Sequence, residues 1–238
     1  MKKLLFSLFT LLCLHSFAQD ITINDANAEK RNLTAPFNAI SVSDGIELLL
    51  TQGNEESVAV SASDPKYMER FKTEVTDGTL KIYYDSKTMV WNRNEKRRLR
   101  AYVSFKTLEK LKASSGSDVK TKSVLTVDKL LLSFTSGAQF TGELNAGDVE
   151  VSQNSGSEIN ASGKAKSLKV DLSSGAIFKG FDLSADFCDA KATSGGEVRI
   201  SVNKELSAKA NSGGGIKYKG EGVLKDINVN SGGSVKKS

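Results

Sequence analysis

The sequence predicts an all-β protein, a right-handed parallel β-helix or β-solenoid with coils of about 19 residues. First, seven Ser-Gly steps recur 18 to 21 residues apart, with their glycines at Gly116, Gly137, Gly156, Gly175, Gly195, Gly213 and Gly232. Second, apolar and polar side chains alternate around every step. Third, only small residues follow each step on the apolar parity. The right hand follows the usual chirality of parallel crossovers.

The alternation indicates strands with one buried face. One coil shows the frame, with the following residues on a single parity: Leu168, Val170, Leu172, Ser174, Ala176 and Phe178. The other coils fit the same frame, and it places Cys188 and Gln153 inward. We therefore expect the serine of each step to point inward and to bond with its stacked equivalents or with backbone. We expect Gln153 to be satisfied by backbone or to lie at a coil edge.

The inner side of each bend is predicted to be crowded, because the chain must turn sharply there. Two places after each serine of a step stands only Ser, Ala or Gly: Ser117, Ala138, Ser157, Ala176, Gly196, Gly214 and Gly233. Glycine supplies backbone freedom at such a bend. A large side chain at these positions would overpack it.

Residues 36–110 lack the Ser-Gly period but are still rich in strand patterns, and we interpret them as an irregular N-terminal cap region. Asp64 and Pro65 are typical of the start of a short helix over 66–71. Asp77-Gly78 predicts a hairpin turn between the runs 73–76 and 79–85. The cap would shield one end of the stack, which an open solenoid needs.

The N-terminus is typical of a secretory signal peptide over residues 1–18, with two lysines, an apolar run and Ser16-Phe17-Ala18 before Gln19. A lipoprotein is disfavoured, because no small residue precedes Cys13. We divide the chain into this signal peptide, an N-terminal extension over 19–35, the β-rich region with a basic hairpin over 36–110, and solenoid coils over 111–238. The expected location is the periplasm, the outer-membrane surface or the extracellular space, with no transmembrane segment.

Cleavage after Ala18 would remove Cys13, His15 and two lysines. The remaining Cys188 could form no intrachain disulfide, and we expect it to be a small buried hydrophobe. Without histidine, neither a histidine triad nor a histidine metal site can form, and the sequence predicts no metal and no cofactor. The net charge would fall from +5 to +3, which indicates no nucleic-acid partner.

Two surface features are candidate binding sites. The outward position two before each glycine carries only Ser, Thr or Asn: Ser114, Thr135, Asn154, Ser173, Thr193, Asn211 and Asn230. Stacked about 4.8 Å apart, they would form a polar file suited to a repeating glycan, although the same residues also suit turns. The other feature is a basic hairpin with the only tryptophan, whose candidate contacts are Trp91, Arg93, Arg97, Arg98 and Arg100. A solvated hairpin tip is the alternative.

Outward acidic residues are the third feature: Glu150, Glu158, Asp171 and Asp189. Paired carboxylates hydrolyse glycosides, and some β-helix enzymes hold calcium with aspartates. No spaced aspartate run marks such a site, so we favour a solvated face and assign no catalytic residue.

Three stretches resemble one known family. They are Phe37 with the run 40–50, Ser57-Val58-Ala59-Val60, and the run 73–82, followed by the serial Ser-Gly coils. Together they resemble the head GIN domain family of auto-transporter adhesin-like proteins, exported by Gram-negative bacteria, many of them Bacteroidetes. The resemblance covers about residues 36–220. It implies the fold and an adhesin-like role, and it brings no binding residues with it.

Three classes of function fit the sequence. The favoured one is an exported, non-catalytic binding protein of the bacterial envelope that contacts a surface polysaccharide or an envelope protein. The second is a purely structural envelope component. The third is a carbohydrate-active β-helix enzyme, which would need carboxylates or a calcium site converging in one groove. The oligomeric state is open.

Overall fold

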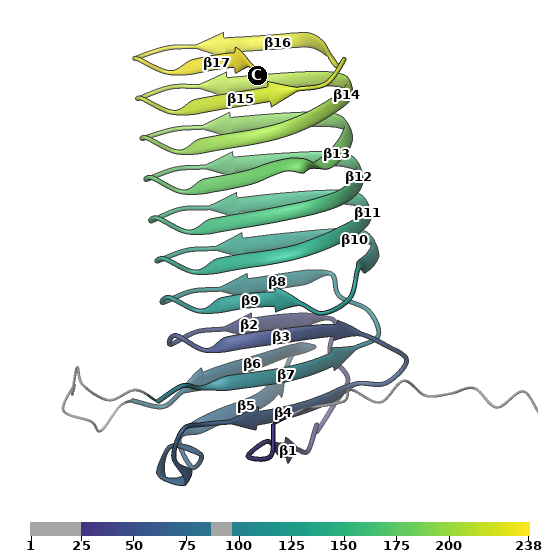
Figure 1. Cartoon of the computed structure of the whole chain (residues 1–238), viewed down its shortest axis with the longest axis vertical. Coiled ribbons are helices and arrows are strands. Elements are labelled where there is room, and N and C mark those ends of the chain that lie inside the picture. Colours follow the sequence, from purple (N-terminus) through teal and green to yellow (C-terminus); the bar gives the residue numbers. More distant parts are fainter. Residues whose placement is uncertain (1–24, 87–96) are drawn as a thin grey trace, which may run out of the picture.

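The structure is a computed structural model that describes residues 25–86 and 97–238. It is a column of flattened β-coils, stacked along one axis (Figure 1). The predicted all-β solenoid is therefore confirmed. The strands are β1 (Glu29–Arg31), β2 (Ala39–Val42), β3 (Glu47–Gln52), β4 (Ser57–Ser61), β5 (Phe71–Thr76), β6 (Thr79–Tyr84), β7 (Arg100–Phe105), β8 (Lys110–Ala113), β9 (Asp118–Thr121), β10 (Leu125–Phe134), β11 (Gln139–Gln153), β12 (Glu158–Leu172), β13 (Ile177–Ala192), β14 (Glu197–Ala210), β15 (Gly215–Lys219), β16 (Val223–Val229) and β17 (Ser234–Lys237).

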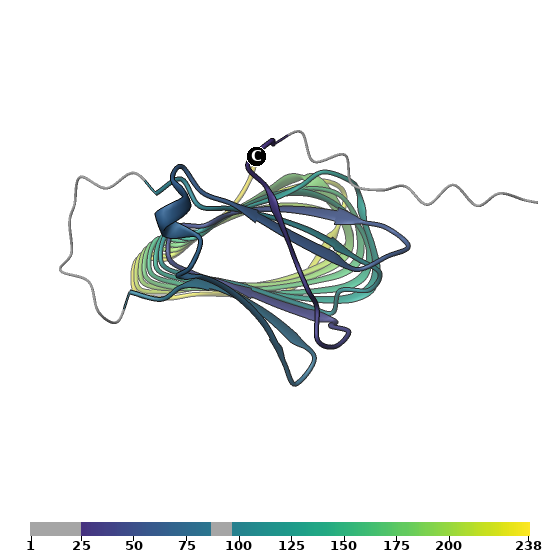
Figure 2. The same ribbon diagram turned by 90° about the horizontal axis from the view of Figure 1, so that it is seen from below.

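Each coil has two faces joined by two unlike edges (Figure 2). At the corner edge the chain passes from one face to the other through a tight Ser-Gly turn. At the rounded edge it bends gradually, and the long strands β11 to β14 run around this edge into the next coil. Neighbouring coils pair in parallel, for example Leu168 with Cys188 and Cys188 with Leu206.

The corner is a four-residue turn whose two central residues both have left-handed backbone, φ 54° at Ser174 and 72° at Gly175. The amide of Ala176 closes the turn by donating to the carbonyl of Ser173 at 3.2 Å. Positive φ at both central positions is the tight-turn geometry for which glycine is favoured. The amide of Gly175 then donates to the carbonyl of Ser194 in the next corner at 3.2 Å, so the corners themselves form a hydrogen-bonded stack.

The expected inward orientation of the step serines is wrong. All seven are exposed at the corner edge: Ser115, Ser136, Ser155, Ser174, Ser194, Ser212 and Ser231. Alternation with period two holds only for extended backbone, and the two left-handed residues interrupt it. Because the turn inserts an even number of residues, Leu172 and Ala176 both still point inward, and the apolar parity looks continuous across it.

The predicted crowding after each step is confirmed. Ser117, Ala138, Ser157 and Ala176 are fully buried. A Cβ added to Gly214 would lie 2.2 Å from the carbonyl oxygen of Ala192. The Oγ of Ser157 donates to the carbonyl of Phe134 at 3.0 Å, whereas the Oγ of Ser117 has no partner among the described residues.

Two further predictions concern the inward side chains of Cys188 and Gln153. The one for Cys188 is confirmed, and the one for Gln153 is confirmed in part. Gln153 is buried, and its Nε2 donates to the carbonyl of Ile177 at 3.1 Å, but its Oε1 has no partner among the described residues. Cys188 is buried, and burial raises the pKa of its thiol to about 12. The thiol is therefore a packing group here and not a nucleophile.

The N-terminal region adds two further coils and a cap. β6 pairs in parallel with β2, and β2 with β8. On the other face β7 pairs with β3, and β3 with β9. The β6–β7 coil thus lies below the β2–β3 coil although it follows it in sequence. Antiparallel pairing of β5 with β6, of β4 with β7 and of β1 with β4 then covers the base of the column.

The local predictions in this region are confirmed with one change of length. Asp64 caps a 3₁₀ helix, η1 (Pro65–Tyr67), by accepting a hydrogen bond from the amide of Lys66. The helix is shorter than the expected 66–71, because Phe71 already belongs to β5 and is fully buried. Asp77-Gly78 forms the predicted hairpin turn, with Thr76 paired to Thr79.

Candidate functional site at the corner edge

The corner edge carries two parallel files of small polar side chains. One is the predicted polar file from Ser114 to Asn230, whose members are half-buried or exposed. The other is the file of exposed step serines. Both continue into the β2–β3 coil, where Ser43 and Asp44-Gly45 take the equivalent places and the amide of Gly45 donates to the carbonyl of Ser115 at 2.9 Å. Asp44 has the same left-handed φ, 66°.

Some polar-file side chains bond to one another or to backbone. The Oγ1 of Thr135 donates to the Oδ1 of Asn154 in the next coil. The Oγ1 of Thr193 donates to the carbonyl of Leu172 at 3.3 Å, and the Nδ2 of Asn230 donates to the Oδ1 of Asn228 at 2.6 Å. Each of these groups can still offer a further donor or acceptor. The edge is therefore a straight, ordered row of hydrogen-bonding groups.

The predicted basic hairpin differs from the structure. Trp91 and Arg93 lie outside the described residues. The strands on either side of this segment belong to different faces, because β6 pairs with β2 and β5 while β7 pairs with β3 and β4. The two strands therefore do not form a hairpin. The amide of Ser43 donates to the carbonyl of Ile82 at 3.1 Å and that of Glu47 to the carbonyl of Leu99 at 3.0 Å, so the end of β6 and the start of β7 lie beside the corner of the coil above.

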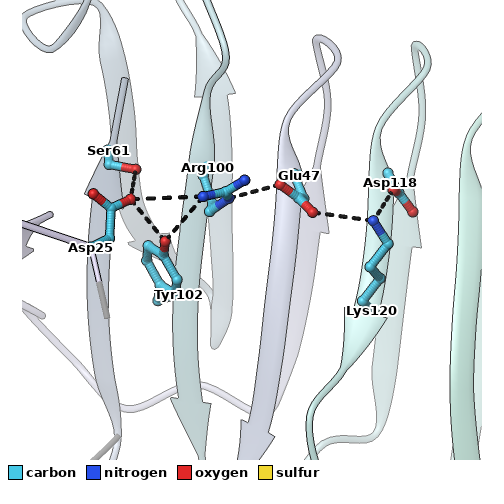
Figure 3. A network of polar contacts seen from close by, with 7 residues as sticks. All are labelled: Asp25, Glu47, Ser61, Arg100, Tyr102, Asp118 and Lys120. Carbon is cyan, nitrogen blue, oxygen red and sulfur yellow. Dashed lines mark hydrogen bonds and ion pairs between the residues drawn. The ribbon is translucent and has the colours of Figure 1, made fainter. Parts of the chain in front are cut away.

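Of the three described arginines of this segment, Arg98 and Arg100 line one hollow, and Arg97 contacts an aromatic ring. The guanidinium of Arg97 lies 4.4 Å from the ring centroid of Tyr84, which is a cation–π contact. Arg98 is exposed and has left-handed backbone, φ 43°. Arg100 is held in a network of polar contacts on the second face (Figure 3). Arg98 and Arg100 are both exposed, and among the described residues only Arg100 of these two forms ion pairs.

This network joins the N-terminal segment to three coils. The Oδ2 of Asp25 accepts hydrogen bonds from the hydroxyls of Ser61 at 2.7 Å and Tyr102 at 2.8 Å. The Nε of Arg100 donates to the Oε2 of Glu47 at 2.7 Å. The Nζ of Lys120 then bridges Glu47 at 3.1 Å and Asp118 at 2.6 Å.

No sequence pattern indicates this network as a whole, because its members are far apart in the chain. Its one local signal was that Glu47 and Asp118 both stand two residues after a corner glycine.

The network shifts the pKa values of Asp25, Glu47 and Lys120 in the directions that favour their charged forms. Hydrogen bonds from Ser61 and Tyr102 lower the pKa of Asp25. Burial raises the pKa of Glu47, but the hydrogen bonds and positive charges of Arg100 and Lys120 outweigh burial and lower it. The carboxylates of Asp118 and Glu47 raise the pKa of Lys120. All three groups are therefore charged near neutral pH, as structural ion pairs are.

The outward acidic residues pair with lysines of neighbouring coils. Glu150 contacts Lys169 at 3.0 Å, Glu158 contacts Lys179 at 2.6 Å, and Asp171 contacts Lys191 at 3.0 Å. Asp189 is exposed. Among residues 25–86 and 97–238 no group of acidic, cysteine and histidine side chains could hold a metal ion. Carboxylates tied to lysines in this way favour a structural role over acid–base catalysis.

Two hollows are lined by residues outside the polar file. One, of about 500 Å³, is lined by Asp25, Asn27, Ser61, Ser63, Arg98 and Arg100. The other, of about 880 Å³, lies at the rounded edge, where Gln52 donates to the carbonyl of Thr126 at 2.9 Å. In the part of the chain that is described, no helix is long and apolar enough to cross a membrane.

Solved structures share this architecture. A "putative adhesin" from Bacteroides fragilis superposes with a TM-score of 0.81 at 18% identity, over 89% of this chain and 96% of that one. A "putative adhesin" from Parabacteroides merdae gives 0.67 at 18% identity, over 90% and 97% of the two chains. A "putative lipid binding protein" from Parabacteroides distasonis gives 0.63 at 18% identity, over 90% and 98%. At this identity the likeness shows the fold alone.

No curated relative matches the sequence. The family model described as "Putative auto-transporter adhesin, head GIN domain" matches residues 36–222, which span both N-terminal coils and nearly all of the Ser-Gly coils. The chain therefore belongs to the head GIN domain family, as its sequence motifs indicated.

Proposed function

We propose that this chain is an exported, non-catalytic binding protein of the bacterial envelope that contacts a hydroxyl-rich polymer, a surface polysaccharide, along its corner edge. The observation that carries the proposal is the corner stack, in which each coil repeats the same Ser/Thr/Asn and Ser pair and the amide of Gly175 bonds to the next corner. Parallel strands repeat about every 4.8 Å, which is close to the length of one sugar unit.

The family supports an adhesin-like role, and the proposal adds the ligand class and the site. Neutral hydroxyls and amides suit a sugar polymer because they can donate and accept along its whole length. Each hydrogen bond contributes only about 0.5–1.5 kcal/mol, so affinity must come from many corners acting together. Arg98 directly precedes Leu99, whose carbonyl accepts from the amide of Glu47 just after the Asp44-Gly45 corner, so its side chain would extend the same edge.

The test is a glycan-array and cell-adhesion screen with matched serine variants. The corner variant combines Ser155→Ala, Ser174→Ala and Ser194→Ala. The control combines Ser133→Ala, Ser152→Ala and Ser207→Ala, three outward serines on a flat face. We expect the corner variant to lose more than about tenfold in affinity, as the loss of three hydrogen bonds implies. The control should bind like wild type.

A second variant combines Trp91→Ala, Arg97→Ala and Arg98→Ala and tests the basic segment separately. If raised salt weakens the binding of wild type but not that of this variant, the arginines belong to the site. Equal loss in the corner variant and the flat-face control would contradict a corner site. Cleavage of a polysaccharide by wild type would place the protein among enzymes, and the absence of any glycan or cell binding would favour a structural component.

A further inference from the structure

The two ends of the column are finished differently. At the base, antiparallel β4 and β5 cover the lowest coil. At the other end, β16 and β17 form the last coil of the stack, and Figure 1 shows no described strand above them. Four of the six large hydrophobic residues that the described structure exposes lie on β16: Val223, Leu224, Ile227 and Val229.

Three of these four side chains continue the core of the coil below. Leu224 stacks on Leu206, Ile227 on Ala208 and Val229 on Ala210. The lower residues are at most 1% exposed, whereas Leu224, Ile227 and Val229 are 40–44% exposed. Their register is therefore that of core positions, and their exposure exists only because nothing in the described structure stacks on them.

We propose that the exposed last coil is a dimerisation surface, on which a second copy of this chain stacks tail to tail about a two-fold axis perpendicular to the column. Head-to-tail stacking would require a free solenoid base, and the cap of β1, β4 and β5 occupies it. A two-fold axis that crosses both faces brings β16 against β16 of the partner and β17 against β17. Both ladders then continue with antiparallel pairs, and the assembly closes at two copies.

The sequence of β16 is self-complementary in one register. An antiparallel pairing centred on Asn228 places Ile227 opposite Val229 of the partner, and Val229 opposite Ile227. Centring the pair on Ile227 instead would set Val229 opposite Lys225, and centring it on Val229 would set Ile227 opposite Ser231, so only the Asn228 register pairs the two apolar side chains with each other. The charges of β16 are paired within the chain, Lys225 with Glu205 at 3.0 Å and Asp226 with Lys209 at 3.5 Å. Lys236 and Lys237 on β17 have no ion pair among the described residues and would weaken the contact through like-charge repulsion.

The size of the surface sets the strength of the contact. The seven residues of β16 span about 23 Å at about 3.3 Å each, and packed sheets lie about 10 Å apart. An end face of this size is below the roughly 800 Å² per partner of a stable complex. We therefore expect a reversible dimer whose population rises with protein concentration.

Sedimentation velocity over a dilution series of the whole protein tests the proposal. Wild type should pass from monomer to dimer as concentration rises. Ile227→Lys combined with Val229→Lys should weaken the dimer by more than about tenfold, because it would bury two unpaired charges. The control Val124→Lys changes an equally exposed apolar residue outside β16, 41% exposed, and should dimerise like wild type.

A milder variant guards against misfolding of the double lysine protein. Asn228→Asp would place two carboxylates face to face across the axis and weaken the dimer about two- to fivefold, and added salt would restore it. Asn160→Asp makes the same change on another coil and should have no effect. A monomer at every concentration, open-ended oligomers, or a dimer insensitive to both β16 variants would overturn the proposal.

Discussion

The corner edge and the rounded edge of each coil both depend on glycine, but for opposite reasons. The corner glycines have φ near 72°, and a Cβ added to Gly175 would meet no atom within 4 Å. On the rounded edge a Cβ on Gly163 would lie 2.1 Å from the carbonyl oxygen of Leu144, and one on Gly147 would lie 2.4 Å from that of Asp128. At the corner glycine thus supplies backbone conformation alone, whereas at the rounded edge close packing requires it, with a positive φ in addition at Gly163.

This difference explains why only one edge is periodic. A tight turn has a fixed number of residues, so the corners stay in register from coil to coil. The rounded edge absorbs variation through bulges, such as the register shift between Gly180 and Ser184. A repeating ligand could therefore match the corner edge and not the rounded one.

The largest effect is expected from Gly163→Ala on the rounded edge. Alanine would bring its Cβ against the backbone of Leu144 while holding φ at 101°. The clash is with backbone atoms, which cannot move aside as a flexible side chain can, and the positive φ adds strain. The free energy of unfolding should therefore fall by about 3 kcal/mol or more. Urea denaturation followed by circular dichroism measures this loss. Wild-type stability would show that the rounded edge has room to relax.

The next effect is expected just inside the corner. Ala176→Leu adds a large side chain at a fully buried position, and overpacking should cost about 1–3 kcal/mol. Ser174→Leu, two residues earlier, is the control, because Ser174 is exposed. Thermal melting of the two variants compares them. Equal losses would contradict the assignment of Ala176 to the inner side and Ser174 to the outer side.

Gly175→Ala isolates the conformational demand of the corner. Its Cβ would lie in open space, so only the left-handed backbone opposes it, at about 1 kcal/mol. Ser174→Asn should be neutral or slightly stabilising, because asparagine tolerates the left-handed region better than serine does. The free energy of unfolding of these variants, set against Gly163→Ala, distinguishes the cost of backbone conformation alone from the cost of conformation and packing together. If Gly175→Ala lowered the free energy of unfolding as much as Gly163→Ala, the proposed difference between the two edges would be wrong.

The smallest effect concerns the charged groups beside the lowest corners. The pKa values of Asp25 and Glu47 lie below their ordinary values of 3.8 and 4.5. Their stabilisation is therefore complete above those values and is lost as the pH falls through the lowered folded-state values. For such exposed pairs we expect about 0.2–1 kcal/mol. A stability profile from neutral pH to pH 3 should be flatter in Glu47→Gln than in wild type, and parallel profiles would contradict this.

The repeat could be predicted because every coil has the same local pattern of residues. Period, inward parity and small residues such as Ala176 follow from strand geometry alone. The outward orientation of Ser174 does not follow from strand geometry. The two left-handed residues turn this side chain outward, while the residues on either side of the turn keep their alternation. The position of the β6–β7 coil below β2–β3 could not be predicted either, since the strand patterns are equivalent and only long-range pairing orders them.

The candidate site divides in the same way. The polar file from Ser114 to Asn230 could be recognised because the same residue types recur at a fixed spacing. In the structure its members lie along one edge. The network around Arg100 joins residues up to 77 positions apart, as between Asp25 and Tyr102. No local pattern encodes such a contact. Arg100 was predicted as a binding residue because it is close to Trp91 in the sequence. In the structure its guanidinium donates to Glu47.

The periodic corner also has a consequence for how a polymer would move on it. Because successive corners are chemically alike, a chain longer than the file could bind in several registers that differ by one coil and have similar energy. Such a polymer would not be locked in place. It could shift stepwise along the edge by exchanging a few weak hydrogen bonds at a time, so that attachment persists while any single contact is brief. The corner stack would then act as a track on which an envelope polymer is retained under tension and still able to slide.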